Sequence, residues 1–287
     1  MRDEKKQTVD FLVVGHLTRD LHSDGDSLGG TAAFAAVTAK RLGWRTGILT
    51  RAADLPQVEM LSGIYLHRLP AEHTTTFRNI YLNGSREQFV HAVAPPICAA
   101  DLPSHWQQAS VVLLGPVADE VDPALAARFP NALVGAVPQG WMRRWDEKGK
   151  VTTWAWEPTP LLLEHVDVMV LSEEDLGGDY ARATELASRM SLFVLTLGKR
   201  GSVVYLNGKP HPVPPRPARQ IDPTGAGDVF TAAFLIRLYE TSDPLQAARF
   251  ANVVASYAIE ALGVDGIPSR DQVEAYLAEH NGIPIPS

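Results

Sequence analysis

The 287-residue chain contains a single cysteine, Cys98, and this scarcity excludes two classes of protein. A disulfide framework needs paired cysteines, and a cysteine-rich metal site needs several at close spacing. The composition is instead typical of a protein that folds in a reducing compartment, so we expect it in the cytoplasm. At this length the chain can bury a large core, and we expect one domain over residues 1–287.

The sequence also lacks an excess of positive charge and any long apolar run. Its 26 lysine and arginine residues are outnumbered by 33 aspartate and glutamate residues, which gives a formal net charge of −7. Surfaces that bind nucleic acids or anionic membranes need clustered lysine and arginine, so we expect neither partner. The apolar run at residues 11–15 is too short for a signal sequence or a membrane span.

Short β-branched runs alternate along the chain with alanine-rich or leucine-rich stretches, without repeats. This alternation is typical of an α/β protein with a three-layer, doubly wound, mainly parallel sheet. The expected strands are residues 11–15, 46–49, 111–115, 132–137, 166–171, 192–197 and 202–206, and the expected helices are residues 31–42, 180–190, 226–239, 244–262 and 270–280.

Residues 62–93 depart from the α/β alternation. Their polar and apolar residues alternate with a period near two, and Asn83-Gly84 is a turn signal. We therefore expect β-hairpin structure there, either as an inserted lid or as an antiparallel edge of the main sheet. The WMRRW run at residues 141–145 favours a surface helix, with a ligand contact by Arg143 or Arg144 as the alternative.

Residues 220–230, QIDPTGAGDVF, place two glycines where an extended segment meets an apolar helix. Free amides and the positive end of the macrodipole make a glycine-rich helix start a pocket for anions. Asp228 would repel a phosphate there, but it could accept a proton from a hydroxyl that attacks the phosphate. The alternative is a capped helix start, with Asp222 or Thr224 as the cap and Gly225 for a tight turn.

A set of motifs in this order resembles the ribokinase-like (PfkB-type) carbohydrate kinase family over residues 10–280. They are VGHLTRD at residues 14–20, LGGTAAFAA at 28–36, LSEED at 171–175, TLGKRG at 196–201 and DPTGAGD at 222–228. The resemblance implies a ribokinase-like fold with a small β lid at residues 62–93. It also implies an ATP- and Mg²⁺-dependent kinase that phosphorylates a hydroxyl of a small sugar or polyol.

The resemblance also implies roles for single residues. Asp228 would be the catalytic base, and the amides of Gly225, Ala226 and Gly227 would hold the charge of the γ-phosphoryl group. The other positions are Asp20, Gly29 and Gly30 at the substrate, and Thr196, Gly198, Gly201, Asn252, Asp222 and Thr224 at the nucleotide and its associated ions. A monovalent cation such as K⁺ near Asp222 is compatible with the resemblance, and the sequence does not decide it.

Departures from the family pattern bear on the substrate and the metal. Phe34 stands where most members have asparagine, which replaces hydrogen-bonding groups with an apolar wall. With Gln139, this variant looks most similar to the myo-inositol kinase branch, whose cyclitol has an apolar ring face for Phe34 to cover. Asp175 keeps a carboxylate where the family has glutamate, and Glu174 and Asp175 are the candidates near Mg²⁺.

Two alternative functions stay open at this point. One is a nucleoside kinase, which would need a base-stacking pocket near the lid. The other is a catalytically silent member that binds a ligand as a sensor; Phe34 and the altered motif at residues 172–175 keep this reading open. The oligomeric state, monomer or homodimer, is not decided by the sequence.

Overall fold

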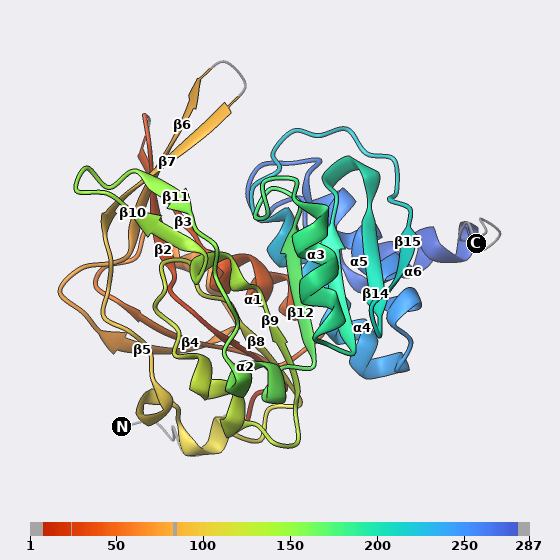
Figure 1. Cartoon of the computed structure of the whole chain (residues 1–287). Helices are drawn as coiled ribbons and strands as arrows, with labels where there is room; N and C mark the ends of the chain where they lie inside the picture. Colours follow the sequence, from red (N-terminus) through yellow and green to blue (C-terminus); the bar gives the residue numbers. More distant parts are fainter. Residues whose placement is uncertain (1–7, 24, 83–84, 281–287) are drawn as a thin grey trace.

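The computed structural model describes residues 8–23, 25–82 and 85–280, and a nine-stranded sheet forms the centre of the molecule (Figure 1). The strand order is β15-β14-β13-β12-β9-β8-β1-β4-β5. Seven strands are parallel, namely β1 (Phe11–Val14), β4 (Thr46–Ala52), β5 (Tyr65–Pro70), β8 (Val111–Leu114), β9 (Leu133–Ala136), β12 (Val168–Ser172) and β13 (Leu192–Thr196), and β14 (Ser202–Leu206) and β15 (Lys209–Val213) continue the sheet antiparallel.

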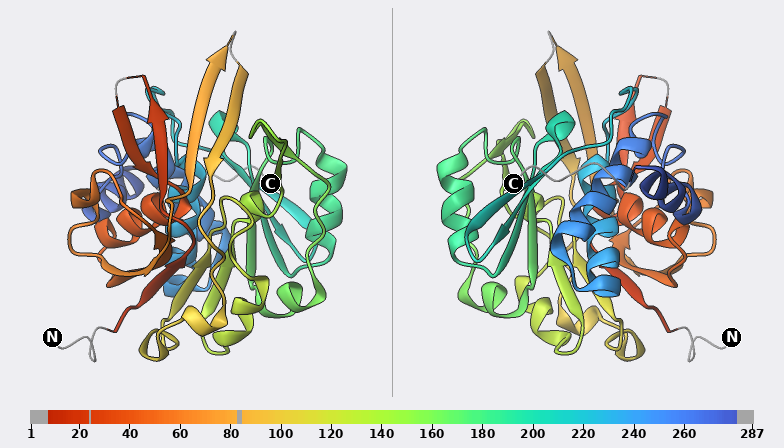
Figure 2. Two further views of the ribbon diagram at one scale, coloured as in Figure 1. Left: turned by 90° about the vertical axis from the view of Figure 1, so that its left-hand side faces the viewer. Right: turned by 90° about the vertical axis from the view of Figure 1, so that its right-hand side faces the viewer.

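Helices cover both faces of this sheet, so the predicted three-layer α/β fold is confirmed (Figure 2). One side carries α1 (Thr31–Arg41), α4 (Ala226–Thr241), α5 (Pro244–Ala258) and α6 (Arg270–Glu279), and the other carries α2 (Pro160–His165) and α3 (Tyr180–Ser188). Short 3₁₀ turns span Val58–Leu61, Ala99–Asp101, Ser104–Trp106, Pro123–Arg128, Pro138–Gly140 and Gly198–Arg200.

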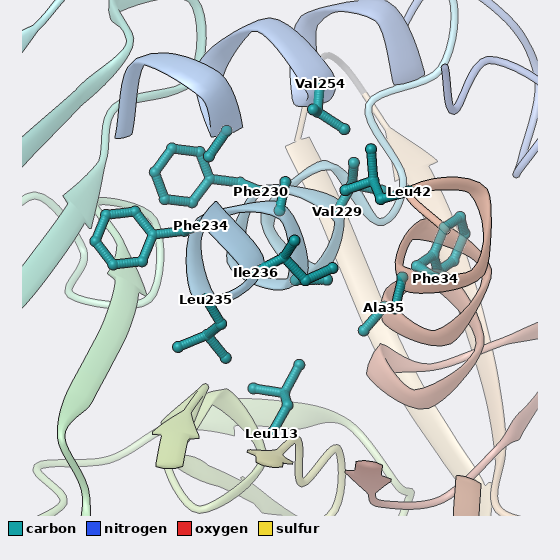
Figure 3. Packing of buried hydrophobic residues seen from close by; sticks show 14 of the residues in the cluster. Phe34, Ala35, Leu42, Leu113, Val229, Phe230, Phe234, Leu235, Ile236 and Val254 are labelled. Carbon is teal, nitrogen blue, oxygen red and sulfur yellow. The ribbon is translucent and has the colours of Figure 1, made fainter. Parts of the chain in front are cut away.

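The doubly covered sheet explains why its strands are apolar throughout. In β1, Phe11 and Val13 face the helices α1 and α4, whereas Leu12 and Val14 face the layer of α2 and α3. All four side chains are fully buried. Helix α4 lies within the core on the α1 side of the sheet. Its residues 229–236 are buried without a break, because the sheet, α1 and α5 surround them (Figure 3).

A second, four-stranded sheet projects from the body, in the order β3-β2-β6-β7 (Figures 1 and 2). It consists of β2 (Thr18–His22), β3 (Gly25–Gly29), β6 (Thr76–Leu82) and β7 (Ser85–Ala92). The region 62–93, where we expect a β-hairpin, therefore contributes to two sheets. Its first part is β5, the parallel edge strand of the main sheet, and its later part is the hairpin of β6 and β7. A period of two fits an edge strand and a hairpin equally, so the pattern could not separate them. Asn83-Gly84 lies outside the described residues.

The WMRRW segment is not the surface helix that its sequence favours. Arg143–Trp145 is the strand β10, which pairs antiparallel with β11 (Val151–Thr153). Arg143 is buried and Arg144 is exposed, as expected for consecutive residues of a strand. None of the helices within the described ranges combines the length and the apolar character needed to cross a bilayer.

The contact between β9 and α4 gives a test of the core. A Cβ atom at Gly135 would lie 2.5 Å from Cδ1 of Leu235, a fully buried side chain. Gly135→Ala should lower the free energy of unfolding by about 1–3 kcal/mol through overpacking, and Leu235→Ala by about 2–5 kcal/mol through the cavity. Because the added methyl group occupies part of that cavity, the double variant should lose less than the sum in urea unfolding. Additive losses would contradict this packing.

Candidate active site

Most of the residues expected at the site lie at the carboxyl ends of the parallel strands or in the segments that follow them, whereas Asn252 lies within α5. In doubly wound α/β proteins this edge of the sheet is where ligands bind. The segments involved follow β1, β8, β9, β12 and β13, and the start of α4 joins them. The second sheet rises from the same edge, because β2 begins four residues after β1 ends (Figure 2).

Asp228 lies in the first turn of α4, directly after the glycines of the motif. The N-cap residue is Gly225, with φ of 75°, and no side chain of the described residues caps this helix end. A Cβ atom at Gly225 would lie 2.3 Å from the ring of Phe34, so both the backbone conformation and the packing require glycine. Gly227 is exposed, which leaves the start of the helix open to solvent.

The side chain of Asp222 does not cap α4, which its position in the sequence allowed, but accepts hydrogen bonds from two other backbone amides. Its Oδ1 accepts a hydrogen bond from the amide of Thr224 at 2.9 Å, and its Oδ2 accepts one from the amide of Gly263 at 2.9 Å. The side chain therefore ties the approach to α4 to the loop after α5. It is also adjacent to the segment where the resemblance puts a monovalent cation, and the cation stays a prediction.

The environment of Asp228 changes its acidity. Burial raises the pKa of Asp228 to about 6, and the negative charge of Asp175 acts in the same direction. The hydroxyl of Thr31, which donates a hydrogen bond to Asp228, and the positive charge of Arg143 lower the pKa but do not cancel the effect of burial. Asp228 is thus ionised at neutral pH and more basic than an ordinary aspartate, as a general base requires.

Asp20 extends from β2 toward the glycine pair at the start of α1. Oδ1 of Asp20 accepts a hydrogen bond from Thr18 at 2.9 Å. A Cβ atom at Gly29 would lie 2.3 Å from Oδ2 of Asp20, and one at Gly30 would lie 2.6 Å from the carbonyl oxygen of His16. The glycine pair therefore allows the carboxylate and the loop after β1 to approach the helix. Contact of these residues with a substrate stays a prediction.

Gln139 and Asp175, expected at the substrate and the metal, are brought into contact. Nε2 of Gln139 donates a hydrogen bond to Oδ1 of Asp175 at 3.0 Å. Oδ2 of Asp175 accepts hydrogen bonds from the amide of Ser172 at 2.9 Å and from its hydroxyl at 2.7 Å. These bonds join the loops after β9 and β12 and aim one carboxylate at the region of Asp228.

The acidic residues suit a weakly held metal. Within the described ranges, no three His, Cys, Asp or Glu side chains form a metal-binding group. Mg²⁺ often keeps several waters and binds through one or two carboxylates together with substrate phosphates. A role near Mg²⁺ for Asp175, and for the exposed Glu174 next to it in the chain, stays a prediction.

The residues expected at the nucleotide form two groups. Thr196 ends β13 and its hydroxyl donates to the carbonyl of Leu171 at 3.4 Å, and Gly198 and Gly201 follow with φ of 54° and 87°. Asn252 is 6% exposed, and its Nδ2 donates to Ser202 Oγ and to the carbonyls of Val213 and Pro214. Its observed contacts therefore hold the loop after β15, and a contact with adenine stays a prediction.

Phe34 is 5% exposed and belongs to the core cluster with α4. Its ring lies against Gly225, so its visible role is to support the glycine turn. An apolar wall for a substrate would need an exposed ring face. The predicted contact with a cyclitol is untested, and only the small exposed part of the ring is available for it.

Two residues near the site, Thr31 and Glu120, were missed in the sequence, and a third, Arg143, was considered there only as the alternative to a surface helix. Thr31 is the first residue of α1 and bonds to Asp228, and its place after Gly-Gly was a signal that could have been read. Glu120 is 2% exposed and accepts amide hydrogen bonds from His16 at 2.9 Å, Val117 at 2.9 Å and Ala118 at 2.7 Å. It joins the loops after β1 and β8. Glu120 gave no pattern that marks an inward-facing side chain, and the WMRRW run did not separate Arg143 from Arg144.

Comparison with known proteins adds independent information. Residues 152–270 match a family model described as pfkB family carbohydrate kinase. Inositol 3-kinase of Oryza sativa subsp. japonica is 29% identical over 284 residues, which cover 89% of this chain and 70% of that protein.

Solved structures share the fold at lower identity. A pyrophosphate-dependent kinase in the ribokinase family, complexed with a pyrophosphate analog and myo-inositol, has a TM-score of 0.77 and 22% identity, covering 92% of this chain and 99% of that one. Arabidopsis thaliana ribokinase complexed with ribose and ATP has a TM-score of 0.73 and 20% identity, covering 94% and 99%. The chain is therefore similar to pfkB family carbohydrate kinases over part of its sequence and to an inositol 3-kinase over most of it, and it has the fold of ribokinase-family kinases.

Proposed function

We propose that the protein transfers the terminal phosphoryl group of ATP to one hydroxyl of a small polyol or sugar, with myo-inositol as the preferred candidate. The observation that carries this proposal is the position of Asp228. A carboxylate with a raised pKa lies in the first turn of a 16-residue helix that has no side-chain cap, beside Gly225 and Gly227, while the amide of Ala226 donates to the carbonyl of Pro223 at 3.2 Å. That arrangement combines a base with an anion site, which phosphoryl transfer to an alcohol needs.

The chemistry at this site follows from the two groups. As a bond forms between the acceptor oxygen and the γ-phosphorus, the bond from phosphorus to the bridging oxygen breaks and ADP leaves. The hydroxyl proton passes to a carboxylate oxygen of Asp228. The charge on the phosphoryl oxygens faces the amides of Gly225 and Gly227 and the positive end of the α4 macrodipole.

The side chains around Asp228 favour a neutral acceptor rich in hydroxyls. Asp20 and Asp175 are carboxylates, which accept hydrogen bonds from hydroxyls and repel anionic acceptors. Gln139 adds an amide to the same group. The inositol 3-kinase relative and the myo-inositol complex of the pyrophosphate-dependent kinase support a cyclitol acceptor. Within the described residues, Phe34 and Phe77 are 5% and 3% exposed, so neither ring offers an open face for stacking a nucleobase.

Three further assignments accompany the proposal. Mg²⁺, held by Asp175 with Glu174 nearby and mainly through water and donor phosphates, would neutralise phosphate charge. The four-stranded sheet β3-β2-β6-β7 serves as the lid of a single domain and excludes water when it closes. We assign the reaction to the cytoplasm, because the proposed donor and the reducing conditions that suit a single cysteine both favour it.

The acceptor and donor can be tested together. Transfer should be measured by mass spectrometry of the product with myo-inositol, ribose, fructose and cytidine, each with ATP or pyrophosphate. We expect myo-inositol with ATP to give a kcat/KM at least about tenfold above every other pair, a difference of about 1.4 kcal/mol in transition-state binding. A preference for cytidine would favour the nucleoside kinase alternative. Absence of transfer to all acceptors would indicate a silent member of the family.

The role of Asp228 can be tested by Asp228→Asn. The amide cannot accept the hydroxyl proton, so kcat should fall at least about 100-fold, while the Kd of ATP changes little. Asp271→Asn is a matched control, because Asp271 also lies in the first turn of a helix but is exposed. Retention of most of the rate in Asp228→Asn would show that Asp228 is not the base.

The raised pKa of Asp228 predicts an acid limb in the rate profile. The base must be deprotonated, so kcat/KM for the acceptor at saturating donor should rise about tenfold per pH unit below pH 6 and level off above it. Initial rates between pH 4.5 and 8.5 would report the apparent pKa of the free enzyme. A profile that is flat from pH 5 to 8, or a midpoint near 4, would contradict the assigned environment of the carboxylate.

A further inference from the structure

Arg143 is a buried cation at the edge of the candidate active site. Its side chain is 8% exposed, and Nη1 donates a hydrogen bond to the carbonyl of Val117 at 2.8 Å. Its Cζ lies 5.5 Å from the centre of the Phe77 ring on β6. Phe77 is paired in register with Asp20 of β2. The guanidinium therefore lies where the loop after β8 meets the lid sheet, close to the strand that carries Asp20.

The charge of Arg143 acts on the reacting centre. It stabilises the ionised form of Asp228, and Asp175 contributes the opposing negative charge at the same carboxylate. A phosphoryl group arriving at Gly225–Gly227 would add further negative charge beside these two aspartates. An arginine is suited to this place, because its planar fork matches phosphoryl oxygens and it stays protonated when buried.

Arg144, the next residue, lies on the other face of β10 and has different contacts. Its Nη1 forms an ion pair with Asp119 at 3.1 Å, and its Cζ lies 4.3 Å from the ring of Trp154. Its side chain is 45% exposed. The two arginines have the same chemistry and adjacent positions, but only Arg143 is buried toward Phe77 and Asp228.

The β10–β11 hairpin that carries Arg143 is docked on the lid sheet. The amide of Val90 on β7 donates to the carbonyl of Gly149 at 2.8 Å, and Phe89 forms a β-bridge with Lys150. Nζ of Lys150 lies 2.5 Å from Oε1 of Glu87, also on β7. A Cβ atom at Gly149, whose φ is 79°, would lie 2.2 Å from the carbonyl oxygen of Val90. Gly149 is thus required for this close contact.

We propose that Arg143 is a catalytic residue of the phosphoryl transfer, held against the transferred group by the docking of the β10–β11 hairpin on β7. The inference rests on the proposed function and adds to it a residue and a means of positioning. The guanidinium donates hydrogen bonds to a phosphoryl oxygen and offsets the repulsion between that group and Asp228. Its effect is largest in the transition state, where the attacking oxygen, the phosphorus and the carboxylate are closest.

The first test compares Arg143→Met and Arg143→Lys with Arg144→Met as the matched control. Arg143→Met should lower kcat at least about 100-fold with less than about a threefold change in the KM of either substrate, since the contact forms mainly in the transition state. Arg143→Lys keeps the charge without the fork and should recover part of the rate. Arg144→Met should stay within about threefold of wild type in both parameters.

The second test concerns the docking of the hairpin. Gly149→Ala should lower kcat about tenfold or more by displacing the hairpin, whereas Gly208→Ala is the control: its φ of 76° is nearly the same, but its added Cβ would meet nothing closer than 3.8 Å. In the Arg143→Met background, Gly149→Ala should have little further effect, because both changes act through one guanidinium. Fully additive losses would overturn the coupling between the hairpin and Arg143.

Thermal melts of each variant separate loss of chemistry from loss of folding. If Arg143→Met is unfolded, the rate of a folded Arg143→Lys decides: a wild-type kcat overturns the inference, and a kcat lowered at least about tenfold supports it. An active wild-type enzyme whose kcat is unchanged in Arg143→Met overturns the role of Arg143 alone. A wild-type enzyme that phosphorylates no acceptor overturns the proposed function and this inference with it.

Discussion

The carboxylate of Asp228 is held partly buried at the start of α4, and the surrounding structure has to keep it there while leaving it ionised. Thr31 bonds to it from α1, and Thr31 itself reaches this place because Gly115, at the end of β8, has no side chain; a Cβ atom there would lie 2.4 Å from Cγ2 of Thr31. Phe34 supports the glycine turn from the same helix. The folded pKa of about 6 exceeds the ordinary value of 3.8, so the folded protein loses stability as the pH rises from 4 to 6, by up to about 3 kcal/mol. The continuous core around α4 offsets this cost.

The rest of the site is a set of loops that polar side chains tie together at the edge of the sheet. Glu120 joins the loops after β1 and β8, Gln139 joins the loop after β9 to Asp175 after β12, and Asp222 joins the approach to α4 to the loop after α5. Each of these side chains uses hydrogen bonds to fix the distance between two segments far apart in the sequence. The parallel strands bring the loops to one edge, and these bonds then determine how the reactive groups face one another.

The sequence predicts the parts of the fold whose cause is local. Strands buried on both faces must be apolar, so β1, β8 and β12 are visible as short hydrophobic runs, and α4 follows its glycine motif. The strands β2, β3, β10 and β11 carry mixed polar residues, and their conformation depends on partners elsewhere in the chain. The same reason hides Arg143, whose burial depends on Phe77 of β6. For Asn252 the motif gives the position, but its bonds to Val213 and Pro214 become visible only when β15 is placed.

The distribution of charge explains why these elements occur together. In the proposed reaction, aspartates that hold a neutral polyol and accept its proton would also repel the phosphate donor, and the repulsion is strong where water is excluded. The protein therefore needs a positive charge that does not compete with the acceptor for the aspartates. In that proposal the start of α4 supplies part of it through backbone dipoles, and Arg143, on a hairpin bonded to the lid sheet, supplies a guanidinium. Because the guanidinium and Asp20 are both connected to the lid sheet, a movement of that sheet would assemble the counter-charge and the acceptor site in one step.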